Sequence, residues 1–286
     1  MAPFFQYEYR SLLNMNHRCL IPTHEFSVHI HDMYEIYYFL SGDVTYLIEG
    51  STYHLQPHDL LLINTGELHR PVFNSSAPYE RLVIHFRPEY ISAFQTQDYN
   101  LLYCFERRKL GQNNLLLAGD IYDSSVHKLF HQLTDFSFSS PEKDLLFKTY
   151  FIQLLIALNQ IFSKQKTTET SAVYDDKISQ VLHYINDHLH EKISLEQLEN
   201  KFFINKYYLC HLFKKNTGIT IGDYISHKRI LKAKELLILG VPVSEVAHAI
   251  GYEDYSTFYR TFKRLTGVSP KSYLAPLDMP LTNKNK

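Results

Sequence analysis

The spacing of hydrophobic positions changes twice along the chain and divides it into three regions. From about residue 17 to 87, hydrophobic residues form short runs rich in Tyr, Ile, Leu and Val, separated by turn residues such as Ser41-Gly42 and Gln56-Pro57. Short strands at regular spacing with Gly and Pro turns are typical of an all-β barrel or sandwich. Five runs are the predicted strands: residues 34–40, 43–50, 51–55, 58–64 and 79–86.

From about residue 119 to 163 the hydrophobic period becomes helical. Residues 120–136 place their apolar side chains on one helical face. Ser140-Pro141, an N-cap followed by Pro at the first helical position, then predicts the start of an apolar helix over residues 143–162. This helix is more apolar than a surface helix needs to be. It is either intradomain core or a subunit interface with a partner helix, and both interpretations can hold together.

The third region contains an internal duplication. Residues 164–173 are polar and without pattern, which predicts a linker, and the chain beyond them is predicted to be helical to about residue 275. Residues 213–220 and 262–269 match at an offset of 49 residues and share the sequence Phe-Lys-x-x-Thr-Gly. A duplication of this size indicates two copies of one supersecondary unit.

Each copy has the sequence signals of two short helices joined by a tight turn. In the first copy, Ser194 caps a short helix, the chain breaks at Phe203-Ile204, and Asn205 caps a second helix that ends at Gly218. In the second copy, residues 244–249 form the short helix and Gly251 supplies the turn. Asp254 caps the next helix, which ends at Gly267. This is the helix-turn-helix pattern, whose second helix can enter a major groove of DNA.

The outward faces of the two second helices suit DNA. Hydroxyl, basic and polar side chains on these faces can contact base edges and phosphates. The outward residues are Tyr207, Cys210, His211 and Lys214 in the first helix, and Ser256, Thr257, Arg260 and Arg264 in the second. Residues 221–239 predict a connecting helix of about 28 Å, so the two recognition helices could lie near one DNA turn, roughly 34 Å, apart. A purely structural bundle is the alternative, which the duplication with basic residues at matched positions disfavours.

Composition and charge agree with a soluble regulator. The 286 residues are 45% hydrophobic and 21% charged, and their length suggests two domains. The net charge is −1, but the part from Tyr174 onward has 16 Lys and Arg against 12 Asp and Glu, a net of +4. Cys19, Cys104 and Cys210 have no disulfide or metal spacing and fit a reducing compartment. Because no signal peptide and no apolar stretch of 18 to 20 residues is evident, we expect a cytoplasmic protein with no membrane partner.

The second copy resembles a known signature. The sequence G-Y-x-D-x-S-x-F-x-R-x-F-K-x-x-x-G-x-S-P-x-x-Y over residues 251–273 resembles that of AraC/XylS-type transcription regulators. The resemblance covers residues 174–275 and extends more weakly to the N-terminal region. It implies a bipartite DNA-binding domain, activation through contact with RNA polymerase, and DNA contacts from Tyr207, Cys210, His211, Tyr255, Ser256, Thr257 and Arg260. Cys210 and His211 depart from the long polar or basic side chains that the family often has in the first helix.

The N-terminal region resembles the cupin barrel. The residues that show this resemblance are His29-x-His31-x3-Glu35-x6-Gly42, Pro57-x-Asp59 and His69. In metal-binding cupins the matching positions would make His29, His31, Glu35 and His69 a site for a divalent transition metal. His29 and His31 would project from the same face of a strand.

Three interpretations of these residues remain open: a metal-dependent enzyme, a sensing barrel whose side chains bind a small polar molecule without metal, and a barrel mouth with no ligand. Tyr37 is added to His29, His31, Glu35 and His69 as a candidate ligand contact, because Tyr34, Tyr37, Tyr38 and Tyr46 could stack on a sugar, although strand aromatics are more often core. We expect His24, His54, His58 and His85 on the surface or in turns.

The sequence therefore predicts an α+β multidomain chain. Residues 1–163 are a cupin-like ligand-sensing and dimerisation domain (barrel about 17–90, helices about 119–163), and 174–286 a double helix-turn-helix domain. The predicted function is a sequence-specific transcription regulator, an activator responding to a sugar or related metabolite. Its expected partners are promoter DNA, RNA polymerase, the effector and a second copy of the chain. No enzyme activity and no cofactor are expected. The alternatives are a metal-dependent cupin enzyme or metal sensor with an appended DNA-binding domain, and an architectural DNA binder, for which +4 is a weak charge.

Overall fold

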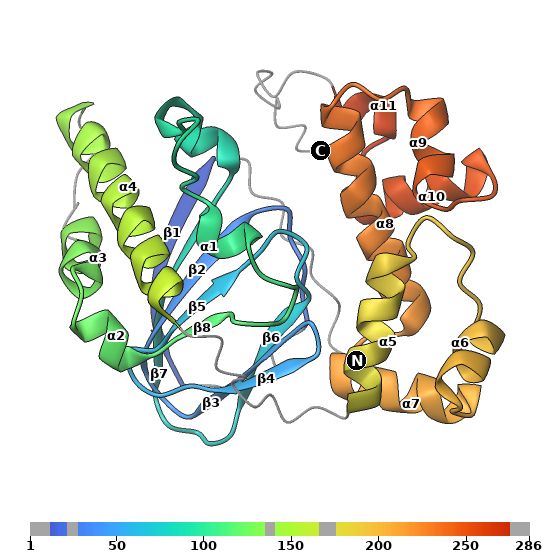
Figure 1. The fold of residues 1–286 in the computed structure, drawn as a ribbon, viewed down its shortest axis with the longest axis horizontal. Coiled ribbons are helices and arrows are strands. Elements are labelled where there is room, and N and C mark those ends of the chain that lie inside the picture. Colours follow the sequence, from blue (N-terminus) through green and yellow to red (C-terminus); the bar gives the residue numbers. More distant parts are fainter. Residues whose placement is uncertain (1–11, 22–27, 135–140, 166–175, 275–286) are drawn as a thin grey trace, which may run out of the picture. The chain divides into compact units, whose positions relative to one another are not determined.

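The computed structural model describes residues 12–21, 28–134, 141–165 and 176–274. The predicted N-cap Ser140, most of the predicted linker 164–173 and His24 lie outside these residues. The chain divides into two compact units, one drawn mainly from Met1–Ser179 and the other from Gln180–Lys215 and Ile219–Lys286 (Figure 1).

The first unit contains two antiparallel sheets. The five-stranded sheet has the order β1-β7-β2-β5-β8 and the three-stranded sheet β4-β3-β6. The strands are β1 (Leu13–Leu20), β2 (Tyr34–Ser41), β3 (Val44–Ile48), β4 (Ser51–His54), β5 (Leu60–Ile63), β6 (His69–Phe73), β7 (Tyr79–Phe86) and β8 (Leu115–Leu116). The five predicted strands are present, and β1, β6 and β8 were not predicted. The fold is the expected cupin-like one, built from two sheets that no strand pairing within the described residues closes into one barrel.

Alternation along the strands separates two cores. In β2, Tyr34, Ile36 and Tyr38 pack on the outer side of the five-stranded sheet, in one cluster with the helices. Tyr37 and Phe39 point to the inner side and pack with residues of the three-stranded sheet. This two-residue period places Glu35 on the inner side with Tyr37, because successive side chains of a strand point to opposite faces.

The helices of the first unit cover the outer side of the five-stranded sheet, and α3 and α4 lie side by side there (Figure 1). They are the 3₁₀ helix η1 (Pro88–Phe94), α1 (Tyr103–Glu106), α2 (Ala118–Tyr122), α3 (Val126–Thr134) and α4 (Pro141–Lys164). The predicted helix over 120–136 is in fact two, because the chain turns between them, where Ser124 Oγ donates to the Ile121 carbonyl.

The prediction that no segment is long and apolar enough to span a bilayer was wrong. Helix α4 (Pro141–Lys164) meets both criteria, length and composition, but a buried core helix meets them as well. In the structure, Phe151, Leu154 and Leu158 of this helix are fully buried in the core against the sheet. We therefore assign α4 to the domain core.

The second unit consists of helices alone. They are α5 (Asp176–Asp187), α6 (Leu195–Phe202), α7 (Lys206–Thr217), α8 (Ile221–Ile238), α9 (Val243–Ala249), α10 (Tyr255–Thr266) and α11 (Pro270–Tyr273). Figure 1 shows α6 and α7 near the start of α8, and α9 to α11 at its other end. The predicted connecting helix over 221–239 is thus confirmed as α8, with a helix pair at each end.

Local capping interactions fix where these helices begin and end. Ser194 and Gln197 form a reciprocal capping box at the start of α6. Asn205 Oδ1 accepts from the Tyr207 amide at the start of α7, and Asp254 caps α10 through the Thr257 amide. Gly267 ends α10 with a φ of 77°, in the left-handed region that favours glycine. These predicted caps are all confirmed.

Candidate effector site and nucleic-acid interface

Three histidine side chains of the first unit converge on one carboxylate oxygen of Glu35. Glu35 projects from the inner side of β2 and is 2% exposed. Its Oε2 lies 2.9 Å from His31 Nε2, 3.2 Å from His69 Nε2 and 3.0 Å from His85 Nε2. Pairing of neighbouring chain segments places these residues together. His85 is the cross-strand partner of Glu35. His29 and His69 form a β-bridge with two backbone hydrogen bonds.

The structure brings together the four residues of the predicted metal set. One ligand atom from each of His29, His31, Glu35 and His69 lies within 4.8 Å of the others. The expectation that His85 lies on the surface or in a turn was wrong, because it faces the same carboxylate from the inner side of β7. Of the other histidines, His54 is exposed, and His58 lies in a turn with a φ of 73°.

Backbone carbonyls fix the orientation of two of the imidazoles. The Nδ1 atoms of His31 and His69 lie 3.0 Å from the Met33 carbonyl and 2.7 Å from the Glu67 carbonyl. A carbonyl oxygen only accepts, so Nδ1 holds the proton in both rings and Nε2 is directed at Glu35. A second hydrogen-bond partner that fixes the tautomer in this way is the usual arrangement around metal-ligating histidines.

At neutral pH the contact between His31 Nε2 and Glu35 Oε2 has no proton to form a hydrogen bond. Burial lowers the pKa of His31 to about 4, so its ring is neutral at pH 7 with a single N–H. Burial would lower the pKa of His69, but its hydrogen bond with Glu35 raises it above the ordinary value. Burial alone would raise the pKa of Glu35, yet the surrounding histidines hold it well below its usual range. A neutral His31 cannot donate to both the Met33 carbonyl and the Glu35 carboxylate.

The donor set therefore fits a divalent cation. Three imidazoles and one carboxylate are ligands that zinc and similar transition metals accept. Two ligands each about 2.1 Å from an ion lie about 3 Å apart when they subtend a right angle at it, which is near the observed Nε2–Oε2 spacings. A cation would also occupy the lone pair that His31 Nε2 directs at the carboxylate. The residues that could hold it are His29, His31, Glu35 and His69, with His85 beside them.

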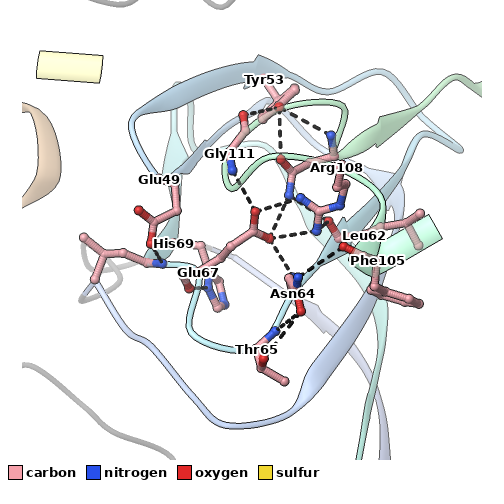
Figure 2. A network of polar contacts seen from close by, with 12 residues as sticks. Glu49, Tyr53, Leu62, Asn64, Thr65, Glu67, His69, Phe105, Arg108 and Gly111 are labelled. Atoms are coloured by element: carbon pink, nitrogen blue, oxygen red, sulfur yellow. Dashed lines mark hydrogen bonds and ion pairs between the residues drawn. The ribbon is translucent and has the colours of Figure 1, made fainter. Parts of the chain in front are cut away.

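A buried ion pair positions the loop that contributes His69 (Figure 2). Arg108 binds both carboxylate oxygens of Glu67 at 2.7 and 2.8 Å, and both side chains are fully buried. The same carboxylate accepts from the amides of Asn64 and Gly111. Because the Glu67 carbonyl holds His69 Nδ1, this network fixes the histidine as well.

A cavity of about 220 Å³ lies beside the histidine–carboxylate cluster, on the inner side of the five-stranded sheet. Its lining is Asn14, Asn16, Arg18, His29, Glu35, Tyr46, Pro71, Tyr79, Arg81, Val83 and His85. His29 and Glu35 thus contact the cavity as predicted candidates. Tyr37 does not line it, because this side chain is 1% exposed and its hydroxyl lies 2.7 Å from that of Tyr79. Tyr46 lines it, whereas Tyr34 and Tyr38 pack in the outer core.

Sequence reasoning missed the cavity residues of β1 and β7. The signal that could have found them is the alternation Asn14, Asn16, Arg18, in which every second residue is polar. Such alternation marks a strand with one polar face, but here the polar face is turned inward.

In the second unit, the predicted recognition helices expose the predicted residues. On α7, Tyr207 is 76% exposed, His211 and Lys214 are exposed, and Cys210 is half-buried. Leu209 and Phe213 on the opposite side are fully buried, as the pattern predicted. The Phe213 ring packs edge-on against Tyr224 of α8, which anchors the first helix pair to the connecting helix.

The second recognition helix, α10, has a similar division. Phe258 and Phe262 are fully buried in a cluster with α8 and α9. Tyr255, Ser256, Thr257, Arg260 and Arg264 are exposed. The Arg260 guanidinium lies along the N-terminal half of the helix, with Nε 3.3 Å from the Ser256 carbonyl and Nη2 3.4 Å from Thr257 Oγ1.

Comparisons with known proteins agree with both units. The model of the AraC-like ligand binding domain matches residues 21–155, and a helix-turn-helix domain model matches residues 198–275. The chain is similar to the lactose operon transcription activator of Staphylococcus xylosus, with 25% identity over 81% of this chain and 80% of that protein. It is similar to the probable transcriptional regulator LumQ of Photobacterium leiognathi, with 28% identity over 86% and 90%. Among solved structures, an apo ToxT variant from Vibrio cholerae has 15% identity and a TM-score of 0.41 over 94% of this chain and 98% of that one.

A ligand-binding β domain joined to a duplicated helix-turn-helix domain defines the class of this protein, a DNA-binding regulator of transcription. Its relatives over most of the chain are transcription regulators. The chain belongs to the AraC family.

Proposed function

We propose that this chain is a ligand-controlled activator that binds promoter DNA through both helix-turn-helix units. The observation that supports this most is the exposure of polar side chains at matched positions of α7 and α10, above fully buried apolar faces. The contacts would come from Tyr207, Cys210, His211 and Lys214 in the first unit. In the second they would come from Tyr255, Ser256, Thr257, Arg260 and Arg264.

The signal would be a sugar or related metabolite bound in the inner cavity of the first unit. The relative named as a lactose operon activator supports this chemical class. Binding would change the arrangement of the β domain and of α3 and α4, and so the pair of DNA half-sites that a dimer occupies. Activation would follow from contact with RNA polymerase in the cytoplasm. We assign no catalytic role to the cluster around Glu35.

Genome-wide mapping of the bound DNA tests this proposal. The expected result is a small set of discrete sites upstream of genes, sharing one sequence motif. A variant with Arg260→Ala and Lys214→Ala, expressed at the same level, should lose these sites. Uniform coverage of the genome without a shared motif would instead indicate an architectural binder and contradict the proposal.

A homodimer formed through α4 is the proposed assembly. Leu145 and Leu146, near the start of this helix, are 62% and 45% exposed, although residues of α4 from Phe151 onward are buried in the core. Replacing both with Glu is expected to convert the dimer to a monomer, because charged side chains would be desolvated in the interface. Analytical ultracentrifugation measures this. The matched control is Leu117→Glu, at a side chain 50% exposed elsewhere in the domain. A wild-type monomer, or a Glu double variant that remains dimeric, would contradict the assembly.

A metal sensor is a second candidate function. The contact between His31 Nε2 and Glu35 Oε2, which has no proton to form a hydrogen bond, favours it. His29, His31, Glu35 and His69 would hold the ion, which would supply a fixed positive charge at the cavity wall. Purified protein is then expected to retain about one equivalent of a divalent transition metal in elemental analysis. His31→Ala should lose it, and His54→Ala, at an exposed histidine, should keep it. Metal-free wild-type protein that takes up no added zinc, iron or manganese would exclude this candidate.

A further inference from the structure

One end of the inner cavity is lined by positive charge from two paired strands. β1 contributes Asn16 and Arg18, and β7 contributes Arg81. The antiparallel register makes Arg18 and Arg81 direct cross-strand partners, with their side chains on the same, inner face. Like charges directly opposite each other destabilise a sheet. Arg18 is exposed and can be solvated by water, so Arg81 is the member of the pair whose charge needs a partner inside the cavity.

Among the described residues Arg81 is satisfied only in part, by a side-chain hydrogen bond with Tyr79 and by the charge of Glu35. Its Nη1 atom is buried and has no hydrogen-bond partner among the described residues. Glu35 is the carboxylate among the lining residues, and the Nε2 atoms of His31, His69 and His85 already surround its Oε2. A buried guanidinium donor left unpaired is costly, and a charge-assisted bond to an anion is the strongest way to satisfy it.

Whereas Arg81 Nη1 lacks an acceptor in the described part of the chain, Asn16 lacks a hydrogen-bond donor there. Its Oδ1 atom, an acceptor, is also buried without a partner among the described residues. An acceptor of this kind is satisfied by a hydroxyl or an N–H group, not by an anion. Since both residues line one cavity and their strands are neighbours, a single ligand would meet both demands if it combined an anionic group with hydroxyls.

We propose that the effector is a polyhydroxylated anion of monosaccharide size. Its anionic group lies on Arg81 and Arg18, one hydroxyl donates to Asn16, and its remaining hydroxyls face Tyr46 and Tyr79. The cavity of about 220 Å³ is smaller than the roughly 300–1,000 Å³ of drug-sized sites, which limits the ligand to a small metabolite. A hydroxyl of a neutral sugar could accept from Arg81, but it would bring no negative charge to the two arginines. This inference rests on the proposed sensing function of the same cavity.

The test measures binding of a defined panel to the purified full-length protein by calorimetry. The panel contains sugar acids (gluconate, glucuronate, galacturonate), sugar phosphates (glucose 6-phosphate, galactose 6-phosphate) and the parent neutral sugars. At least one anion is expected to bind 10-fold or more tightly than its neutral parent. A comparison of the sugar acids with the sugar phosphates identifies which anionic group the arginines bind. If no anion exceeds its neutral parent, the inference is wrong.

Variants of the cavity arginine make the test specific. Arg81→Gln should weaken binding of the preferred anion at least 10-fold and leave the weak binding of the neutral sugar unchanged, whereas Arg81→Lys should have an intermediate effect. The control is Arg107→Gln, at an exposed arginine of the same domain that does not line the cavity. Because it removes like-charge repulsion, Arg81→Gln is expected to melt at or above the wild-type temperature without ligand, which separates lost binding from misfolding. Unchanged anion binding in Arg81→Gln would overturn the inference.

DNA affinity, measured on the same samples, separates the two proposals. Anion binding that leaves the DNA affinity unaltered would support the ligand class and contradict its regulatory role. A neutral compound that alters DNA affinity, with no anion bound, would contradict the ligand class and leave the sensing function standing.

Discussion

Arg108→Met is expected to lower the free energy of unfolding of the N-terminal domain by about 3–5 kcal/mol. The Arg108 side chain is fully buried and binds both oxygens of Glu67, and it also donates to the Leu62 carbonyl. Removing it would leave the Glu67 carboxylate buried without its counter-charge. Burial alone would raise the pKa of Glu67, but Arg108 and the hydrogen bonds to the carboxylate hold it below its ordinary value, so the carboxylate is ionised in the wild type and its pKa rises when the guanidinium is lost.

Urea denaturation of the full-length protein, followed by fluorescence of its tyrosines, measures this loss. Arg107→Met, at the exposed neighbouring position, should change the stability little. Glu67→Gln combined with Arg108→Met should recover part of the loss, because the amide keeps one oxygen for the Asn64 or Gly111 amide without a buried charge. If Arg108→Met and Arg107→Met were equally stable, the ion pair would not organise the His69 loop as described.

Arg260→Ala is expected to weaken binding to specific DNA by about 1–3 kcal/mol, roughly 5- to 150-fold in Kd. Arg260 is exposed on α10 beside Ser256 and Thr257, and its guanidinium is held only by two long hydrogen bonds to its own helix. It is therefore available for the bidentate contacts that arginine makes with guanine or phosphate.

Fluorescence anisotropy on a DNA fragment selected from a random pool by the wild-type protein measures this effect. Lys232→Ala removes one positive charge from α8, outside both recognition helices, and should change the affinity only slightly. If Arg260 contacts a base, its loss should reduce binding to the selected DNA more than to a scrambled fragment. An equal loss on both fragments would assign Arg260 to a phosphate, and no loss on either would remove it from the interface.

The helical domain could be predicted from sequence because its signals are local. Ser194, Asn205 and Asp254 cap helices through contacts within three residues, and Gly267 ends one through its own backbone conformation. Nothing distant is needed to place these boundaries. The duplication then indicated which faces were exposed, and α7 and α10 follow it.

The cavity could be predicted only in part because its residues meet across strands. His29, His31, Glu35 and His69 followed a recognisable spacing, and the structure gathers them. His85 has no such spacing, and its place opposite Glu35 depends on the register of β7 against β2. β1 was missed for a related reason. Its polar positions face inward to a cavity, which is the reverse of the usual strand whose polar face is exposed to solvent.

Hydroxyl-radical footprinting on the selected DNA tests the central claim, that one chain binds DNA through two helix-turn-helix units. For each bound chain we predict two protected stretches on one face of the duplex, about one helical turn apart. Arg260→Ala should weaken protection over one stretch and Lys214→Ala over the other. A single protected stretch per chain, or equal loss over the whole site in both variants, would contradict the account.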